Sequence, residues 1–254
     1  MIKVVKIGGN VIDNPAALAQ FLDDFAALQG PKILVHGGGK EATRLSGAMG
    51  IETTMINGRR VTDGATLEVV TMVYAGLINK RIVSGLQARG VNALGLTGAD
   101  GRAIVSHRRP AAPVDYGFVG DIDSVNRELI ESLLGRQIVP VFCAITCDAA
   151  GQLLNSNADS VAGAVALCAA SIGETELHFC FDKQGVLLDI DDPKSIVEEI
   201  NESKFAELKS QGVVHSGMLP KIENALSVCR QGVNSVFIEA GVGDTYAPRT
   251  RVRL

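Results

Sequence analysis

The strongest constraint on the fold is an alternation along the chain between short β-branched runs and longer segments with helical spacing. Strands are predicted within 2–7, 32–36, 91–98, 138–145, 176–181 and 235–240, and helices within 15–28, 40–50, 67–90, 127–137, 158–173 and 219–232. This alternation predicts an α/β fold, with a mainly parallel central sheet and helices on both of its faces. Ligands of such sheets bind beyond the carboxyl ends of the strands. Residues 102–120 are expected to form a hairpin or lid.

Composition excludes several classes of function. The formal net charge is −4, which gives no basic field for nucleic acid. We find no apolar run long enough to span a membrane, and the chain enters its first strand without a signal peptide, so we expect a cytoplasmic protein. Five cysteines form no CxxC pair and are expected to be reduced. Cys143 and Cys147 could be metal ligands, but no further cysteine or histidine cluster completes a site, and we predict none.

An unusual lysine lies at the end of the first predicted strand. In the segment VVKIGGN, Lys6 interrupts a run of β-branched residues, and Gly8 and Gly9 follow closely. A buried ammonium is costly unless an anion meets it. Glycines allow a backbone to approach a ligand and direct its N–H groups at it. The segment therefore predicts an anion-binding site.

A second glycine loop, HGGGK at 36–40, lies between a predicted strand and a predicted helix. The N–H groups at such a helix N-terminus would face a negative ligand. A tight turn alone would need fewer glycines than three in a row. GGGKEA also fits a loose dinucleotide-binding pattern, but no acidic residue ends a strand about 20 positions later. No Walker A sequence and no GxSxG sequence occurs.

Two polar segments in the second half of the chain add candidate residues. Lys221 lies in the first turn of a predicted helix, where its charge opposes the helix dipole unless an anion is bound; otherwise it is a solvated surface lysine. In NSNADS, Asp159 could be only an N-terminal helix carboxylate, or it could hold two lysines in place. Asn155 and Asn157 could cap the helix or donate to a substrate carboxylate.

Six segments in order, KIGGN, VHGGGK, NGRRVTD, GFVGDI, NSNADS and SGMLPK, resemble the N-acetylglutamate kinases of the amino acid kinase family. The resemblance runs from Lys3 almost to the last predicted strand. It implies a three-layer αβα sandwich and phosphorylation of the γ-carboxylate of N-acetyl-L-glutamate by ATP, the second step of arginine biosynthesis. ATP and Mg²⁺ carried on its phosphates are the implied cofactors, and no nucleic acid or membrane partner is expected.

The resemblance also assigns roles to single residues. Lys6 and Lys221 take the places of two lysines that stabilise the transition state, and Asp159 that of the aspartate that organises them. Residues implied to bind the acyl glutamate are Gly38, Gly39, Arg60 and Asn155. Residues implied to bind phosphate or ATP are Gly8, Gly9, Asp182, Gly185, Val186, Leu187, Val213, Val214 and His215.

Three departures from the family pattern bear on these roles. Phe181 and Lys183 replace the residues usual in the nucleotide segment, which affects the expected adenine and ribose contacts. Arg59 lies where the family often has an apolar residue. The C-terminal segment is longer than the usual ending. Alternatives are a family member that acts on another N-acyl glutamate such as N-succinylglutamate, on carbamate or on UMP, or a non-catalytic ligand sensor.

The resemblance also carries expectations about organisation. A single domain is expected, with an N-terminal lobe of about residues 1–151 for the acyl glutamate and a C-terminal lobe of about 152–254 for ATP. Family members inhibited by arginine usually carry an extra helix before the first strand, whereas here the strand-like run begins at Ile2. We therefore expect a homodimer without arginine inhibition, with the helix at 67–90 as the candidate interface.

Overall fold

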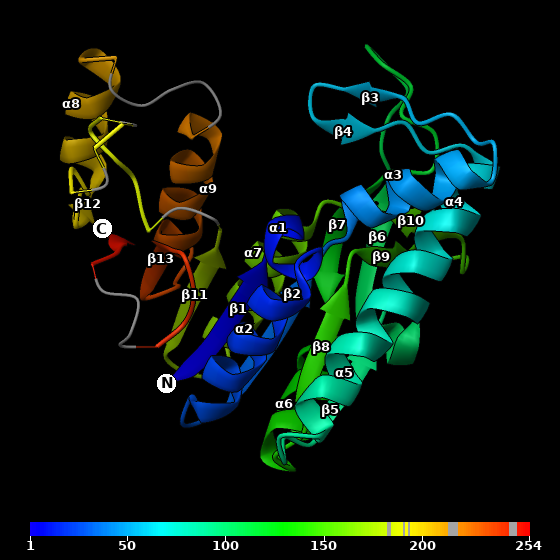
Figure 1. Ribbon diagram of the computed structural model, residues 1–254, viewed down its shortest axis with the longest axis horizontal. Helices are drawn as coiled ribbons and strands as arrows, with labels where there is room; N and C mark the ends of the chain where they lie inside the picture. The colour runs from blue at the N-terminus through cyan, green and yellow to red at the C-terminus, as the bar shows by residue number, and fades with distance from the viewer. Residues whose placement is uncertain (182–183, 190, 193, 213–217, 244–247) are drawn as a thin grey trace.

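The computed structural model describes residues 1–181, 184–189, 191–192, 194–212, 218–243 and 248–254 (Figure 1). The strands are β1 (Ile2–Ile7), β2 (Lys32–His36), β3 (Met55–Ile56), β4 (Arg59–Arg60), β5 (Ala93–Leu96), β6 (Ile104–Arg108), β7 (Gly120–Val125), β8 (Val139–Cys143), β9 (Ile145–Cys147), β10 (Leu153–Asn155), β11 (Thr175–Cys180), β12 (Glu199–Ile200), β13 (Ser235–Glu239) and β14 (Thr250–Val252). The α-helices are α1 (Gly9–Ile12), α2 (Pro15–Ala27), α3 (Gly39–Ala48), α4 (Gly64–Thr71), α5 (Asn79–Gln87), α6 (Arg127–Gly135), α7 (Ala158–Ala170), α8 (Glu202–Ser210) and α9 (Leu219–Arg230). A π-helical segment, η1 (Met72–Ile78), joins α4 to α5, and a short 3₁₀ turn, η2 (Asp100–Arg102), precedes β6.

The main sheet runs through the whole molecule. Its described strands lie in the order β12-β14-β13-β11-β1-β2-β8-β5, and only the pairing of β13 with β14 is antiparallel. β1 lies at the centre, between β2 and β11, so Lys6 is opposite Val35 on one side and Phe179 on the other. The predicted α/β fold with a mainly parallel sheet is confirmed. Smaller sheets are formed by β10-β9-β6-β7 and by the β3–β4 hairpin.

Two hydrophobic cores cover the two faces of the main sheet. Adjacent strand residues point to opposite faces, and Val4 accordingly packs in one core and Val5 in the other. The core that contains Val4 includes buried residues of α6, α7, α8 and α9. The core that contains Val5 includes buried residues of α2, α4, η1 and α5. The layers are therefore helix, sheet and helix, as predicted.

Local sequence explains where several helices begin. Pro15 occupies the first turn of α2, where its missing N–H costs nothing, and the Asn14 side chain accepts hydrogen bonds from two N–H groups of that turn. Asn157 caps α7 in the same way by accepting from the N–H groups of Asp159 and Ser160. The cap fixes the start of α7, and with it the position of Asp159.

Three predicted elements differ from the structure. The helix predicted at 67–90 extends over α4, η1 and α5, with a π-helical register in its middle. The strand predicted at 138–145 divides at Ala144: β8 belongs to the main sheet and β9 to the four-stranded sheet. The 102–120 segment contributes β6, which pairs antiparallel with β7, so it forms one arm of a hairpin.

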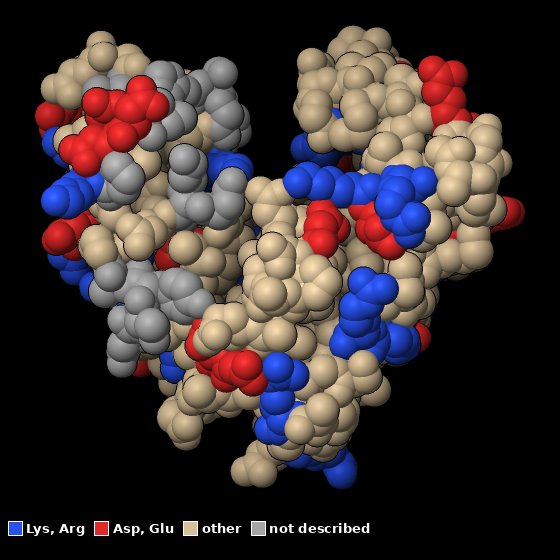
Figure 2. Space-filling view, viewed as in Figure 1, with Lys and Arg blue, Asp and Glu red and all other residues tan. Residues whose placement is uncertain are grey.

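The molecule is divided at one edge. In Figure 1 the β3–β4 hairpin and α3 stand on one side of α1, and α8 and α9 stand on the other. Figure 2 shows the surface hollowed between these two parts. The hollow lies on the side of the sheet at which β1 leads into α1, which is the edge where the carboxyl ends of parallel strands meet.

By length and composition, the helical stretch Gly64–Gln87 could cross a bilayer. Its inner side is buried instead: Leu67, Val70, Val73, Ile78 and Ile82 all belong to the hydrophobic core on one face of the sheet. The stretch therefore contributes to the hydrophobic core of the fold.

Candidate active site

Two glycine loops lie side by side at the carboxyl edge of the sheet. β1 ends at Ile7 and β2 at His36, and these two residues are paired in the parallel register. The chain leaves β1 through Gly8 into α1 and leaves β2 through Gly37 and Gly38 into α3. Neither helix has a side-chain cap, so the N–H groups of both first turns are open to a ligand.

Gly38 occupies a position that no other residue fits. Its φ of +156° is a conformation that L side chains rarely adopt. A Cβ there would lie 2.3 Å from Ile78 Cδ1 and 3.0 Å from Tyr74 Cδ1, both in the η1 segment. The loop therefore packs directly against η1. The π-helical segment thus determines the position of the loop backbone that would meet a ligand.

Lys6 and Asp159 meet above the end of β1. Lys6 Nζ lies 2.8 Å from Asp159 Oδ1, and the Lys6 residue is only 7% exposed. Lys221, in the first turn of α9, places its Nζ 3.7 Å from the centroid of the Phe181 ring, and Lys6 Nζ lies 5.2 Å from the same centroid. The structure thus brings the two predicted lysines and the aspartate together around one aromatic ring, which the cations contact through its negative face.

A cavity of about 280 Å³ opens beside this cluster. It is lined by Arg59, Asn157, Asp159, Ser160, Phe179, Phe181, Lys221, Asn224 and Ile238. Phe181 entered the sequence prediction only as a departure from the family pattern. Its contact with both lysines could not be read from the sequence, because the three residues come from β1, the end of β11 and α9.

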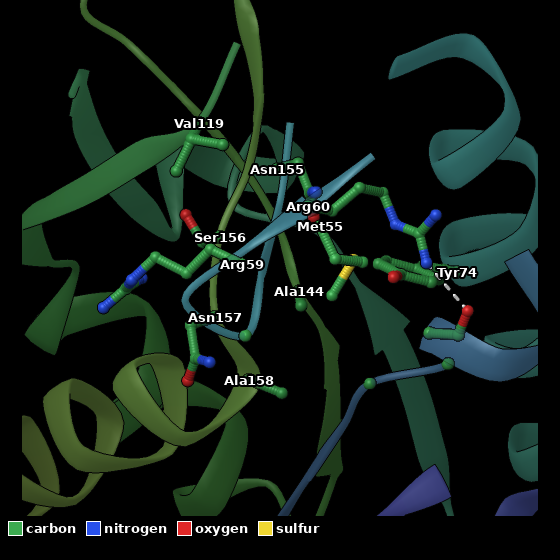
Figure 3. A pocket seen from close by; sticks show the side chains of 14 residues that line it. Met55, Arg59, Arg60, Tyr74, Val119, Ala144, Asn155, Ser156, Asn157 and Ala158 are labelled. Atoms are coloured by element: carbon green, nitrogen blue, oxygen red, sulfur yellow. Dashed lines mark hydrogen bonds between the residues drawn. The ribbon is translucent and has the colours of Figure 1, made fainter. Parts of the chain in front are cut away.

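A second cavity of about 190 Å³ adjoins the glycine loop (Figure 3). Its walls are Gly37, Gly38, Gly39, Met55, Gly58, Arg59, Arg60, Tyr74, Val119, Ala144, Asn155, Ser156, Asn157 and Ala158. Arg59 and Asn157 line both cavities, so the two are neighbours. All four residues predicted to bind the acyl glutamate line this second cavity.

Arg60 and Asn155 are both buried and held in place. The Arg60 guanidinium donates to the Gly39 carbonyl at 2.9 Å, to Thr43 Oγ1 at 2.8 Å and to Thr53 Oγ1 at 3.0 Å. Asn155 Nδ2 donates to Thr62 Oγ1 at 3.0 Å. Arg60 therefore fixes the glycine loop as well as presenting positive charge beside it. Burial raises the pKa of Tyr74 in the same wall, which keeps the phenol protonated.

The predicted nucleotide residues are only partly placed. Asp182, Val213, Val214 and His215 lie outside the described residues. Gly185, Val186 and Leu187 line neither of the two cavities. Val186 N donates to Thr250 Oγ1 at 2.8 Å, and a Cβ on Gly185 would lie 2.6 Å from the same oxygen. Their role in binding ATP stays a prediction.

Cys143 and Cys147 are both buried. Burial raises the pKa of Cys143 to about 12 and also raises that of Cys147, so both are protonated thiols at physiological pH. Among the described residues, no three histidine, cysteine, aspartate or glutamate side chains gather in a metal-binding group.

His36 supports the second glycine loop from below. The ring is fully buried; Nδ1 donates to the Gly37 carbonyl at 2.8 Å, and Nε2 accepts from Asn79 Nδ2 at 3.1 Å. Asn79 Nδ2 also donates to the Val141 carbonyl at 2.9 Å. Burial lowers the pKa of His36 to about 4, so the ring is neutral at physiological pH.

This burial predicts a pH effect on stability. The unfolded chain takes up a proton near pH 6.5 but folded His36 only near pH 4, so stability falls as pH drops through this window, by up to about 3 kcal/mol. His178 has the opposite effect: burial lowers its pKa, but hydrogen bonds to Glu176 and Glu239 outweigh burial and raise it, so its contribution to stability is lost as pH rises through the folded pKa. Histidine-resolved NMR titration should show His36 neutral at pH 5; a midpoint near 6.5 would contradict the predicted burial.

Comparison with known proteins agrees with this geometry. The sequence pattern of the amino acid kinase family matches residues 1–239. An acetylglutamate kinase of Parabacteroides distasonis is 52% identical over 235 residues, 92% of each chain. One of Methanopyrus kandleri is 41% identical over 240 residues, covering 93% of this chain and 94% of the relative.

Solved structures show the same fold. A protein of Streptococcus mutans UA159 superimposes with a TM-score of 0.80 at 27% identity, covering 99% of this chain and 98% of the other. A carbamate kinase of Giardia gives a TM-score of 0.69 at 12% identity, covering 99% and 98%. From the match over residues 1–239 and the relatives above 40% identity, we conclude that the chain belongs to the amino acid kinase family.

Proposed function

We propose that this protein transfers the γ-phosphoryl group of ATP to the γ-carboxylate of N-acetyl-L-glutamate and forms N-acetylglutamyl 5-phosphate, the second step of arginine biosynthesis. The observation that carries the proposal is that Lys6, Asp159 and Lys221 lie together, beside two glycine loops that lead into helices without a side-chain cap. The relatives named acetylglutamate kinase support the choice of acceptor.

The chemistry explains why positive charge gathers here. ATP and the acceptor carboxylate are both anions and repel each other. The transition state spreads negative charge over the equatorial oxygens of the transferring group and over the attacking and leaving oxygens. Because the carboxylate is already a nucleophile, no general base is required. The site has to provide fixed positive charge and N–H donors where this charge develops.

The residues divide this work between them. Lys6 serves the acceptor side and Lys221 the donor side, and Asp159 holds the Lys6 ammonium in place. The N–H groups of Gly38 and Gly39 bind the γ-carboxylate, and the N–H group of Gly9 faces the phosphoryl side. Gly8 N–H donates to the Cys180 carbonyl at 3.3 Å, so Gly8 serves the phosphate only by allowing the backbone to approach it. Mg²⁺, carried on the ATP phosphates, adds neutralising charge to the transferring group.

The remaining binding roles follow from the two parts of the molecule. Arg60 and Asn155 bind the α-carboxylate in the lobe of residues 1–151. The lobe of residues 152–254 binds ATP. The residues that the family resemblance assigns to this role are Asp182, Gly185, Val186, Leu187, Val213, Val214 and His215.

An assay of ADP formation tests the proposal. Purified protein with ATP and Mg²⁺ should release ADP rapidly when N-acetyl-L-glutamate is added and only slowly without it. Carbamate and UMP serve as the matched alternative acceptors. Turnover with either of these and none with N-acetyl-L-glutamate would replace the proposed acceptor. Ligand binding without turnover of any acceptor would instead support a non-catalytic sensor.

We expect Arg60→Lys to weaken binding of the acyl glutamate. A guanidinium can hold a carboxylate through two parallel hydrogen bonds, whereas an ammonium cannot. The loss of one hydrogen bond to a charged group corresponds to about a tenfold rise in KM for N-acetyl-L-glutamate. KM for ATP should change less than about twofold on the same scale. Steady-state kinetics with each substrate varied in turn would check this, and equal rises in both KM values would contradict the role.

We also propose a cytoplasmic homodimer, with helix 64–87 at the interface. Met72 and Leu77 on this helix are 52% and 38% exposed. Exposed large apolar side chains on one helix favour contact with another copy of the chain.

The double variant Met72→Lys/Leu77→Lys should therefore be a monomer of 26.7 kDa, whereas the parent should have twice that mass. Four buried ammonium groups at a twofold interface would be too costly to keep. Leu254→Lys is the control, because Leu254 is 63% exposed and follows β14, near the opposite end of the main sheet from β5. Light scattering gives the masses, and a double variant that stays dimeric would place the interface elsewhere.

A further inference from the structure

Among the described residues, Arg59 and Asn157 line both cavities, and of these two only Arg59 is charged. It lies next to Arg60 in the two-residue strand β4. Neighbouring residues of a strand point to opposite sides. Figure 3 shows the result: the Arg60 guanidinium extends toward Tyr74, and the Arg59 guanidinium extends the other way, past Ser156 and Asn157.

Arg59 is partly buried, and among the described residues no carboxylate forms an ion pair with it within 4 Å, although its charge contributes to the lowered pKa of Asp121. Two carboxylates in this part of the molecule have other partners. Asp121 accepts two hydrogen bonds from the Arg109 guanidinium, and this pairing is the main cause of its lowered pKa. Asp159 is paired with Lys6. An arginine stays charged at every physiological pH, so a partly desolvated guanidinium in a substrate cavity is a candidate for binding an anion.

The shape of the substrate indicates which anion this is. Glutamate carries three substituents that the site has to place: the γ-carboxylate, the α-carboxylate and the acylated nitrogen. The proposed function, on which this inference rests, directs the first to the glycine loop and the second to Arg60. The remaining wall carries Val119, Ser156 and Arg59. The acyl group therefore faces the second arginine.

We propose that Arg59 binds a carboxylate at the end of the N-acyl group, so that the protein phosphorylates N-acetyl-L-glutamate but prefers an N-acyl-L-glutamate whose acyl group comes from a dicarboxylic acid. A neutral acetyl group would leave the guanidinium without a carboxylate in an ion pair. A terminal carboxylate would form a charge-assisted, bidentate pair with it. The neighbouring 280 Å³ cavity, which Arg59 also lines, gives room for a chain longer than acetyl.

One alternative use of Arg59 has to be separated from this one. Because Arg59 also lines the cavity that contains Lys221 and Asp159, its guanidinium could meet the ATP phosphates instead. That role would affect every acceptor equally. Loss of that role would also change kcat and KM for ATP. Loss of binding to the acyl carboxylate would change only the ratio of kcat/KM between charged and neutral acceptors.

The test compares three acceptors: N-acetyl-, N-butyryl- and N-succinyl-L-glutamate. Butyryl and succinyl have the same carbon chain length, so their comparison separates charge from length. For the parent protein we expect kcat/KM with the succinyl compound to exceed that with either neutral compound at least about tenfold, the scale of one charge-assisted pair. In Arg59→Leu the succinyl-to-butyryl ratio should fall to about one, and Arg59→Lys should recover part of it. Arg127→Leu, on α6 outside both cavities, removes the same charge as a control.

Each outcome has a distinct meaning. A parent protein that uses butyryl or acetyl as well as succinyl overturns the inference without any variant. If Arg59→Leu lowers kcat for all three acceptors and raises KM for ATP, Arg59 serves the phosphates and the inference is also wrong. If no acyl glutamate is phosphorylated at all, the proposed function fails; good turnover of the acetyl compound with poor turnover of the succinyl one overturns only the role of Arg59.

Discussion

Lys6→Met and Lys221→Met should each lower kcat at least about 100-fold, the effect of losing one preorganised donor at the transferring group. Methionine keeps most of the lysine volume but removes the charge. Lys6 is buried and held 2.8 Å from Asp159, and Lys221 lies against the Phe181 ring, so both ammonium groups are fixed in place and no solvent molecule that enters a variant would supply the missing charge. The loss should appear in kcat more than in KM, because the charge it neutralises develops in the transition state.

Lys209→Met is the matched control. Lys209 also lies over a phenylalanine ring, 5.8 Å from the centroid of Phe205, but on α8 and outside both cavities. Its variant should keep kcat within about twofold, since losing an exposed charge pair changes little. Circular dichroism and thermal unfolding would show that all three variants fold. Near-parental kcat in both the Lys6 and Lys221 variants would end the two-lysine mechanism.

Gly38→Ala should lower kcat/KM for the acyl glutamate at least about 100-fold, because a displacement of about 1 Å at a reacting centre can cost that much. The new Cβ would lie 2.3 Å from Ile78 Cδ1, and Ile78 is only 1% exposed, so its side chain has little space to move. The φ of +156° would also be strained for alanine. The loop has to shift, and its N–H groups then no longer meet the γ-carboxylate.

Gly47→Ala provides the comparison within the same helix. No atom lies within 4 Å of a Cβ at Gly47, and the residue is in the helical part of α3. Alanine there should leave activity unchanged and raise stability by about 0.5–1 kcal/mol through helix propensity. If Gly38→Ala is as active as Gly47→Ala, the glycine loop does not bind the reacting group.

The parts of the fold that local sequence determines were predictable. β1, β2 and the start of α3 follow from β-branched runs and from glycines at the strand ends. The π-helical register of η1 was not predictable, because it depends on distant contacts. Asn79 directly after it bonds His36 and the Val141 carbonyl, and Gly38 rests on its Ile78. Helix propensities within residues 67–90 do not report these contacts with distant residues.

The candidate site shows the same limit. The resemblance supplied Lys6, Lys221 and Asp159, and the structure brings them together, but the role of each stays a prediction until it is measured. Phe181 was visible in the sequence only as an unusual residue, since the two lysines that contact it are far away in the chain. Arg59 was likewise visible only as a departure. Its direction, opposite to Arg60, depends on the two-residue strand β4, which the sequence patterns did not predict.

The central claim is that a carboxylate oxygen of the acceptor attacks the γ-phosphorus of ATP. N-acetyl-L-glutamate labelled with ¹⁸O in its γ-carboxylate tests this directly, with hydroxylamine present to trap the acyl phosphate as a hydroxamate. Hydroxylamine attacks the carbonyl carbon and releases phosphate with the bridging oxygen attached. The account predicts one ¹⁸O in each phosphate released, together with an equal amount of hydroxamate. Phosphate that contains no ¹⁸O would mean that water attacks ATP and would contradict the claim.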